Sequence, residues 1–379
     1  MDTDQSTLLW SPEIALRSKK QVLLEDWGTS DQNEAEMKRS NTHLTPVPAF
    51  ETWTTFKPTF KPHGLTVFYH AHSSPPIPST AEIYDANEKD SIRGKLGNHA
   101  VCRLGDAVVK YSCDPNVLSE AEDLLFLAEK RPELRIPTVF AAWSTTRENE
   151  DATYYFMMNF IKGIALSDEK FAELSIYAQD TICSKVSSQL RYLRDLPSEG
   201  YYGRPYHQGW LNPPVHLETN SSGSIAVTGP YKTYEEFCAA IYRARQMNRA
   251  VGTQGLEWRP KEVENTTELV SIFSGWTHNE PRLTWLDPQI RNIVARQVIA
   301  NDGSEDWEVF LIDWECFGWY PAWLQGLQVR RRSGIVLVQG TDFTLHRESE
   351  IRPMMLKDFD PEPDEERMAG LSKHYWEFY

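Results

Sequence analysis

The chain has 379 residues, of which 40% are hydrophobic and 25% are charged, as is usual for a globular protein with a large core. Its formal net charge of −15 argues against nucleic acid and anionic membranes as general partners. It has no apolar run of about 18 residues to span a membrane and no signal-peptide pattern at its start, so the cytoplasm is the expected location. The five cysteines are scattered without a Cys-x-x-Cys pair, which argues against a zinc knuckle or a disulfide framework.

Residues 1–75 form an extension whose composition changes along its length. The first part is polar, and the second is rich in proline and aromatic residues. Polar segments cannot bury enough apolar surface to fold alone, whereas aromatic side chains can bind to a neighbouring surface. We therefore expect an extension that is partly disordered or draped on a lobe.

Residues 76–160 read as a small β-rich lobe that contains one distinctive lysine. Val108–Tyr111 is a short apolar strand that carries Lys110, and residues 116–130 predict a helix that begins after Pro115. Either Glu120 or Glu122 on that helix would pair with Lys110, and we prefer Glu120. A lysine in a strand is otherwise an ordinary edge residue. The apolar face of the helix comprises Leu118, Ala121, Leu124, Leu125 and Ala128.

Residues beyond about 160 are predicted to be mostly helical. An apolar stripe of period 3.6 runs through residues 172–195, and core packing is enough to explain it. Thr233 and Glu236 have the spacing of a capping box before another helix.

Three polar side chains surround a predicted hairpin in the last third of the chain. Asp287 precedes Asn292 by five residues, and Asp313 ends an apolar run. Between Asn292 and Asp313, two β-type segments flank a turn at residues 301–303, so the chain returns to its starting level and Asp313 lies beside Asn292.

This spacing is typical of enzymes that transfer a phosphoryl group from ATP. Asn292 and Asp313 supply the hard oxygen ligands that Mg²⁺ prefers, and Asp287 would position or deprotonate a substrate hydroxyl. Lys110 would contact the α- and β-phosphates. The alternative is that the two aspartates are ordinary loop acids beside a hairpin.

Together these segments resemble the aminoglycoside phosphotransferase/choline kinase-like family, in particular its large fungal branch. The most specific match is Asp313-Trp314-Glu315 followed by Gly318-Trp319-Tyr320-Pro321. The similar segments span residues 79–86, 97–98, 103–111, 154–163, 229–237 and 312–321.

The resemblance implies an α+β, protein-kinase-like fold with a small β-rich N-lobe at residues 76–160 and a larger, mostly helical C-lobe at 161–329. Residues 330–379 diverge from it. It also implies a kinase that uses ATP and Mg²⁺ to phosphorylate a hydroxyl group of a small molecule. The backbone groups of Asn159 and Ile161, in the hinge between the lobes, would face adenine.

The chain departs from the family at the catalytic loop, which usually reads His-Gly-Asp-Leu. Trp285 and Leu286 stand in place of the histidine and the glycine. The indole of Trp285 can fill the space of the histidine and replace one of its hydrogen-bond donors, whereas Leu286 lacks the conformational freedom of glycine. An active enzyme with a reshaped loop, a nucleotide- or ligand-binding protein without catalysis and an enzyme that transfers another group are therefore all consistent with this loop.

The acceptor site has only a compositional signal. Aromatic residues gather in the segments that flank the inserted helices, where the family commonly builds this site, and Tyr202, Trp210 and Trp276 are the candidates for walls that hold a cation by cation–π attraction. The alternative is that these rings belong to the hydrophobic core.

Overall fold

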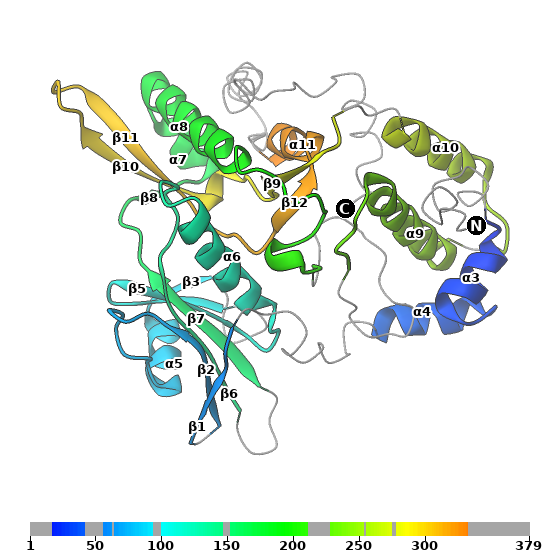
Figure 1. The fold of residues 1–379 in the computed structure, drawn as a ribbon, viewed down its shortest axis with the longest axis horizontal. Coiled ribbons are helices and arrows are strands. Elements are labelled where there is room, and N and C mark those ends of the chain that lie inside the picture. The colour runs from blue at the N-terminus through cyan, green and yellow to red at the C-terminus, as the bar shows by residue number, and fades with distance from the viewer. Residues whose placement is uncertain are drawn as a thin grey trace.

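The computed structural model describes residues 17–41, 56–62, 64–93, 100–146, 152–210, 228–253, 255–274 and 278–332. Within these ranges, the N-lobe is built on an antiparallel sheet of seven strands in the order β1-β2-β6-β7-β5-β4-β3 (Figure 1). The strands are β1 (Thr59–Lys61), β2 (Leu65–His70), β3 (Ser91–Arg93), β4 (Ala100–Leu104), β5 (Ala107–Ser112), β6 (Val139–Thr145) and β7 (Thr153–Asn159).

The two faces of this sheet bury different helices because side chains alternate along a strand. Val109 of β5 belongs to a core cluster with Ile83 of α5 (Thr80–Lys89). Val108, on the other face, packs in the main core with Leu118 of α6 (Asn116–Lys130). Lys110 has the same parity as Val108, so it faces α6 and the rest of the molecule.

The C-lobe combines helices with two small sheets. One sheet has the order β11-β10-β8 and the other pairs β12 with β9. The predicted hairpin is present, because β10 and β11 are antiparallel in a register that pairs Ile293 with Leu311. The elements are β8 (Ile164–Ala165), α7 (Asp168–Glu173), α8 (Ile176–Arg194), β9 (Pro281–Trp285), β10 (Ile293–Ile299), β11 (Glu305–Leu311), β12 (Phe317–Pro321) and α11 (Trp323–Arg332), with short 3₁₀ turns at Pro205–His207 and Ile290–Asn292.

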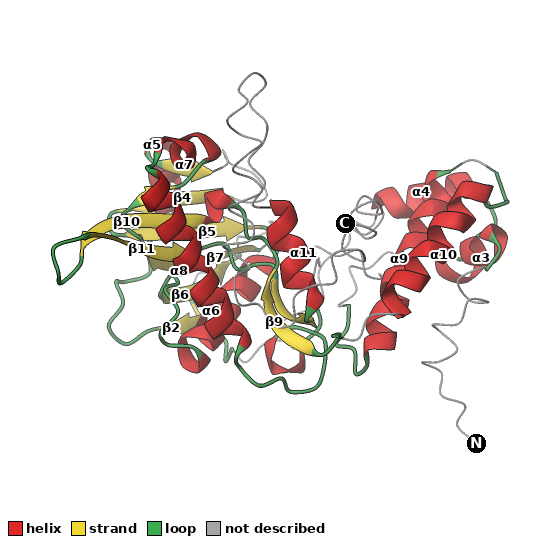
Figure 2. Ribbon diagram, turned by 90° about the horizontal axis from the view of Figure 1, so that it is seen from above, coloured by secondary structure: helices red, strands yellow, loops and turns green. Residues whose placement is uncertain are grey.

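A group of four helices lies on the side opposite the N-lobe sheet (Figures 1 and 2). They are α3 (Lys19–Trp27), α4 (Gln32–Asn41), α9 (Tyr234–Gly252) and α10 (Pro260–Ser274). Val22, Leu23 and Trp27 of α3 form a buried cluster with Met247 and other residues of α9. Part of the extension predicted for residues 1–75 therefore forms two helices that pack on α9. β1 and β2 also lie within residues 1–75 but belong to the N-lobe sheet, so this sheet begins before the predicted boundary at residue 76.

The α+β class, with a β-rich N-lobe and a larger, mostly helical C-lobe, is as predicted from the sequence. The helix predicted at 116–130 matches α6. The helical stripe at 172–195 belongs to two helices, because the side chain of Ser175 accepts a hydrogen bond from the Ala178 N–H and starts α8 anew. Among the described helices, none is both long enough and apolar enough to cross a membrane.

Only one of the two hydrogen bonds of the capping box predicted at Thr233 is present. The Thr233 side chain accepts a hydrogen bond from the Glu236 N–H, as expected. The Glu236 carboxylate instead accepts from the N–H of Lys232, at 2.7 Å.

Candidate functional site

A cavity of about 330 Å³ lies between the N-lobe sheet and the paired strands β8 and β10. Its walls are mainly apolar, and its polar residues include Lys110, Asn292 and Asp313. Cavities of this kind, mostly apolar with a few polar groups that converge, are the usual form of a small-molecule site. The apolar side chains that line it include Ile92, Val101, Val108, Met158, Val294 and Ile312.

The Lys110 ammonium group lies between two carboxylates from distant parts of the chain. Its Nζ is 2.6 Å from Oε2 of Glu120 and 2.7 Å from Oδ1 of Asp313. Glu120 is the partner preferred from the sequence. Its other oxygen accepts a hydrogen bond from the Trp314 N–H at 3.1 Å, so Glu120 contacts both the lysine and the segment that follows β11.

Burial and charge act in opposite directions on this pair. Burial disfavours the charged form of Lys110, but Glu120, Asp313 and Glu315 outweigh burial and raise the pKa of the ammonium group above its ordinary value. Burial also raises the pKa of the Glu120 carboxyl group, and the Lys110 cation opposes that rise. Lys110 is thus a permanent cation at the edge of the cavity.

Asp287 and Asn292 are joined directly. Nδ2 of Asn292 donates to Oδ2 of Asp287 at 2.9 Å and to its main-chain oxygen at 3.0 Å. Gln289 donates to the other carboxylate oxygen at 2.8 Å. The Asn292 main-chain oxygen accepts from the Ile312 N–H at 2.9 Å, which brings Asn292 to the residue before Asp313. Because the amide nitrogen of Asn292 is turned toward Asp287, its oxygen remains the atom suited to a cation.

Trp285 contacts the loop that carries Asp313. It is fully buried, and its indole N–H donates to the main-chain oxygen of Asp313 at 3.1 Å. Asp313 has a left-handed φ of 64°, a conformation that aspartate tolerates better than most residues. Among the described residues, the only other non-glycine residues with positive φ are Tyr206 and His207, so Leu286 does not need the freedom of a glycine.

The two residues predicted to form the hinge, Asn159 and Ile161, line the apolar part of the cavity. Asn159 is the last residue of β7, and Ile161 follows two residues later. The Asn159 N–H is engaged, since it donates to the Thr138 main-chain oxygen at 3.0 Å. The side-chain oxygen of Asn159 accepts a hydrogen bond from the N–H of Thr138 at 2.6 Å. These two bonds hold the end of β7 against the loop before β6.

Glu315 lies beside Asp313 and Glu120, and it is not among the site residues predicted from the sequence. Carboxylate oxygens of Glu120, Asp313 and Glu315 lie within 4.8 Å of one another, the only such group of potential metal-ligating side chains among the described residues. The available signal was the Asp-Trp-Glu motif, in which the glutamate follows Asp313 by two residues.

Packing accounts for two of the three aromatic residues considered for the acceptor site. Tyr202 and Trp210 are 4% and 2% exposed and lie in a hydrophobic cluster of the C-lobe. The hydroxyl group of Tyr202 donates to the main-chain oxygen of Asn279, and the Trp210 ring stacks on Tyr320. Neither ring is available to a ligand in this arrangement. Trp276 lies outside the described residues.

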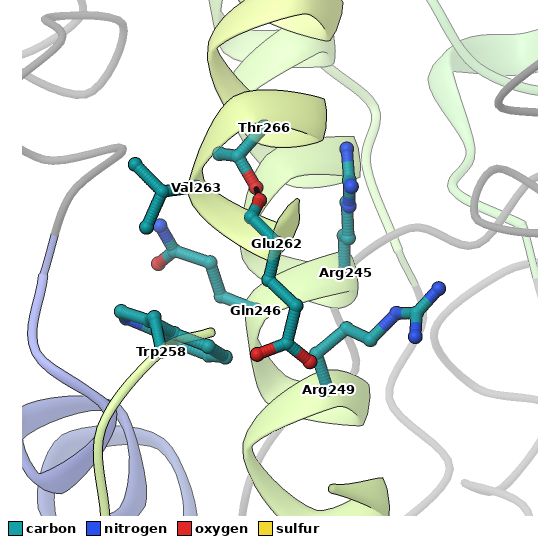
Figure 3. Close-up of a pocket in the computed structure, with 7 residues that line it drawn as sticks. All are labelled: Arg245, Gln246, Arg249, Trp258, Glu262, Val263 and Thr266. Atoms are coloured by element: carbon teal, nitrogen blue, oxygen red, sulfur yellow. Dashed lines mark hydrogen bonds between the residues drawn. The ribbon is translucent and has the colours of Figure 1, made fainter. Parts of the chain in front are cut away.

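A second, much smaller cavity lies between α9 and α10 (Figure 3). Its volume of about 20 Å³ is enough for a single water molecule. Arg245, Arg249, Glu262 and Trp258 are among the residues that line it, and it is too small for a metabolite.

No family model matches the chain, and no curated protein matches it. The chain is similar to several solved structures. The streptomycin–ATP ternary complex of APH(2″)-IIa covers 79% of this chain and 90% of its own, with 14% identity and a TM-score of 0.48. ADP-bound aminoglycoside phosphotransferase APH(2″)-Ib covers 79% and 88%, with 16% identity and a TM-score of 0.44. A putative aminoglycoside phosphotransferase from Ralstonia eutropha covers 75% and 81%, with 11% identity and a TM-score of 0.38.

Proposed function

We propose that the protein is a kinase of the aminoglycoside phosphotransferase/choline kinase-like type, which transfers the γ-phosphoryl group of ATP to a hydroxyl group of a small molecule. The observation that carries the proposal is the position of Lys110, held between Glu120 and Asp313 at the edge of an apolar cavity. A fixed cation beside an apolar slot suits a ligand with a flat base and a chain of phosphates.

In this proposal Lys110 contacts the phosphates, and the adenine lies among the apolar side chains near Asn159 and Ile161. The acceptor oxygen attacks the γ-phosphorus in line, the bond to the ADP oxygen breaks, and Asp287 takes the hydroxyl proton. Asn292 holds the Asp287 carboxylate in place. Positioning and charge neutralisation supply most of the rate enhancement.

The oxygen ligands fit a magnesium ion. Asp313 and Asn292 would hold it, and Glu315 would complete the set because its carboxylate lies close to that of Asp313. Carboxylate and amide oxygens are the ligands that Mg²⁺ prefers. When bound, the ion neutralises the charge of the phosphate oxygens.

Two measurements test this function in order. Mg-ATP should raise the melting temperature of the wild-type protein, since a ligand at 100 times its Kd adds about 2.7 kcal/mol of stability. ATP turnover against a panel of hydroxylated metabolites should then give a product heavier by one phosphoryl group. Asp287→Asn should bind ATP but lose turnover. A product with any other added group contradicts phosphoryl transfer.

A binding protein without catalysis is the second candidate, and the catalytic loop favours it. Both carboxylate oxygens of Asp287 already accept hydrogen bonds, from Gln289 and Asn292. If wild type and Asp287→Asn bind Mg-ATP equally and neither turns over ATP with any acceptor, the protein acts by binding alone.

A further inference from the structure

A buried arginine of the C-lobe contacts the helix that carries Glu120. Arg204 is 2% exposed, and its guanidinium reaches α6 at three residues that bracket Glu120. It donates to the main-chain oxygen of Ser119 at 3.0 Å and to Oε2 of Glu122 at 3.3 Å. It also donates to both carboxylate oxygens of Asp123, at 2.9 and 3.4 Å.

This contact fixes α6 in two directions. A main-chain oxygen and two side chains on neighbouring positions of one helix determine both its rotation and its position along its axis. The rigid, planar guanidinium faces all of these groups at once, with the two hydrogens of Nη2 shared among the Ser119, Glu122 and Asp123 oxygens, a geometry that a lysine ammonium does not offer. The hydrophobic effect that packs residues such as Leu118 against the sheet is non-directional, so the directional bonds from Arg204 add a separate constraint on the helix.

The segment that carries Arg204 is itself held firmly. The hydroxyl group of Tyr201 donates to the main-chain oxygen of Arg204 at 2.8 Å and accepts from the His207 N–H at 3.1 Å. Gln208 accepts from Arg204 through both its side chain and its backbone, each at 2.8 Å. Tyr206 and His207 both have left-handed φ angles, a backbone strain that persists only where the surrounding contacts enforce it.

The same segment is bonded to the strand that follows the Asp313 loop. Gly203 and Trp319 of β12 exchange main-chain hydrogen bonds at 3.1 and 2.7 Å. The approach is close, since a Cβ on Gly318 would lie 2.6 Å from the Gly203 oxygen. A continuous set of contacts therefore runs from the Asp313 loop through β12, Gly203, Arg204 and α6 to Glu120, and through Lys110 back to Asp313.

We propose that Arg204 is a positioning residue of the phosphate site, which holds α6 so that Glu120 keeps Lys110 directed at the nucleotide phosphates. The inference rests on the proposed function. A buried ion cluster adds little net stability compared with apolar packing, and in some proteins it selects one arrangement over others. Here the arrangement selected is that of the helix that orients the phosphate-binding lysine.

The test compares the affinity of the full-length protein for Mg-ATP with its affinity for adenosine, measured by calorimetry. Arg204→Lys keeps the charge but loses the fork of donors. It should weaken Mg-ATP binding by about tenfold, within the range of coupling between contacting residues, and leave adenosine binding unchanged. Arg194→Lys is the matched control, because Arg194 is also buried in the C-lobe and donates to the main-chain oxygen of Ala322, away from α6. It should leave the ratio of the two affinities unchanged.

A double variant separates positioning from general loss of structure. If Arg204 acts through Glu120, then Arg204→Lys should weaken Mg-ATP binding no further in a Glu120→Gln background. If Arg204→Lys fails to fold, Asp123→Asn takes its place, because it removes one charge at nearly constant shape. Asp123→Asn should lower the affinity for Mg-ATP relative to the affinity for adenosine.

Three outcomes overturn the proposal. An Arg204→Lys protein with wild-type affinities for both ligands shows that the arginine does not position the phosphate site. Equal weakening for both ligands shows a structural role alone. A wild-type protein that binds no Mg-ATP overturns the proposed function and this inference with it, whereas the first two outcomes leave the proposed function intact.

Discussion

The indole N–H of Trp285 donates to the main-chain oxygen of Asp313 at 3.1 Å, and this bond joins the end of β9, before the hairpin, to the loop after it. Gln325 of α11 fixes Trp285 from the other side, since its amide donates to the Trp285 oxygen and accepts from the Trp285 N–H, each at 2.9 Å. The tryptophan therefore supports the left-handed conformation of Asp313.

Trp285→Phe should lower the free energy of unfolding by about 2 kcal/mol, because it removes the indole donor to the partly buried main-chain oxygen of Asp313. It should also weaken Mg-ATP binding, since Asp313 is then less firmly held. Urea unfolding and calorimetry measure the two effects. Trp307→Phe is the control: Trp307 is also buried and donates its indole N–H to Glu305 within β11, away from the cavity. Equal losses of nucleotide affinity in the two variants would contradict a specific role for Trp285.

Lys110→Met should destabilise the fold by about 3 kcal/mol near neutral pH, because it leaves the buried Glu120 carboxylate without its cation. The loss should shrink as the pH falls. Without Lys110, burial raises the pKa of Glu120 further above its unfolded value, so the folded variant binds a proton and gains stability relative to wild type at low pH.

Urea unfolding between about pH 5 and pH 8 tests this dependence on the Glu120 proton. Lys185→Met removes an exposed pair with Asp306 and should cost less than about 1 kcal/mol at either pH. A Lys110→Met loss that does not change with pH would show that Glu120 is not the group left unpaired.

Two neighbouring leucines test whether α3 is part of the folded protein. Leu23 is fully buried against α9, and Leu24 is 48% exposed. Leu23→Ala should lower the free energy of unfolding by about 3 kcal/mol, the cost of an apolar cavity. Leu24→Ala should change it by less than about 0.5 kcal/mol. Equal, small effects on urea unfolding would show that α3 does not stabilise the C-lobe.

The cysteines should differ in reactivity toward a thiol reagent at pH 8. Burial raises the pKa of Cys102 to about 11 and raises that of Cys238 well above its ordinary value. Only the thiolate reacts, so both should stay unmodified in the native protein. Cys113 is exposed and should react first. Mass spectrometry of peptides after brief labelling reads out the order, and early labelling of Cys102 would contradict the packing of β4 against α5.

Local patterns account for the parts of the site that were predicted. The pairing of Lys110 with Glu120 follows from a strand and a helix adjacent in the chain, and the hairpin that brings Asn292 toward Asp313 follows from two β-type segments and a turn. The division of the 172–195 stripe was missed because Leu174 continues the apolar period while Ser175 starts a new helix.

The sequence by itself determined the α+β class, the Lys110 strand with the helix after it, the hairpin between Asn292 and Asp313, and the polar side chains that converge on one cavity, because hydrophobic period, turns and caps act over a few residues. The tertiary structure decided the contacts between distant segments. It placed Tyr202 and Trp210 in the core, brought Glu315 to Asp313 and Glu120, and set Arg204 on the helix of Glu120 some eighty residues earlier. Such contacts depend on how whole lobes pack, and no local pattern specifies which buried partners then meet.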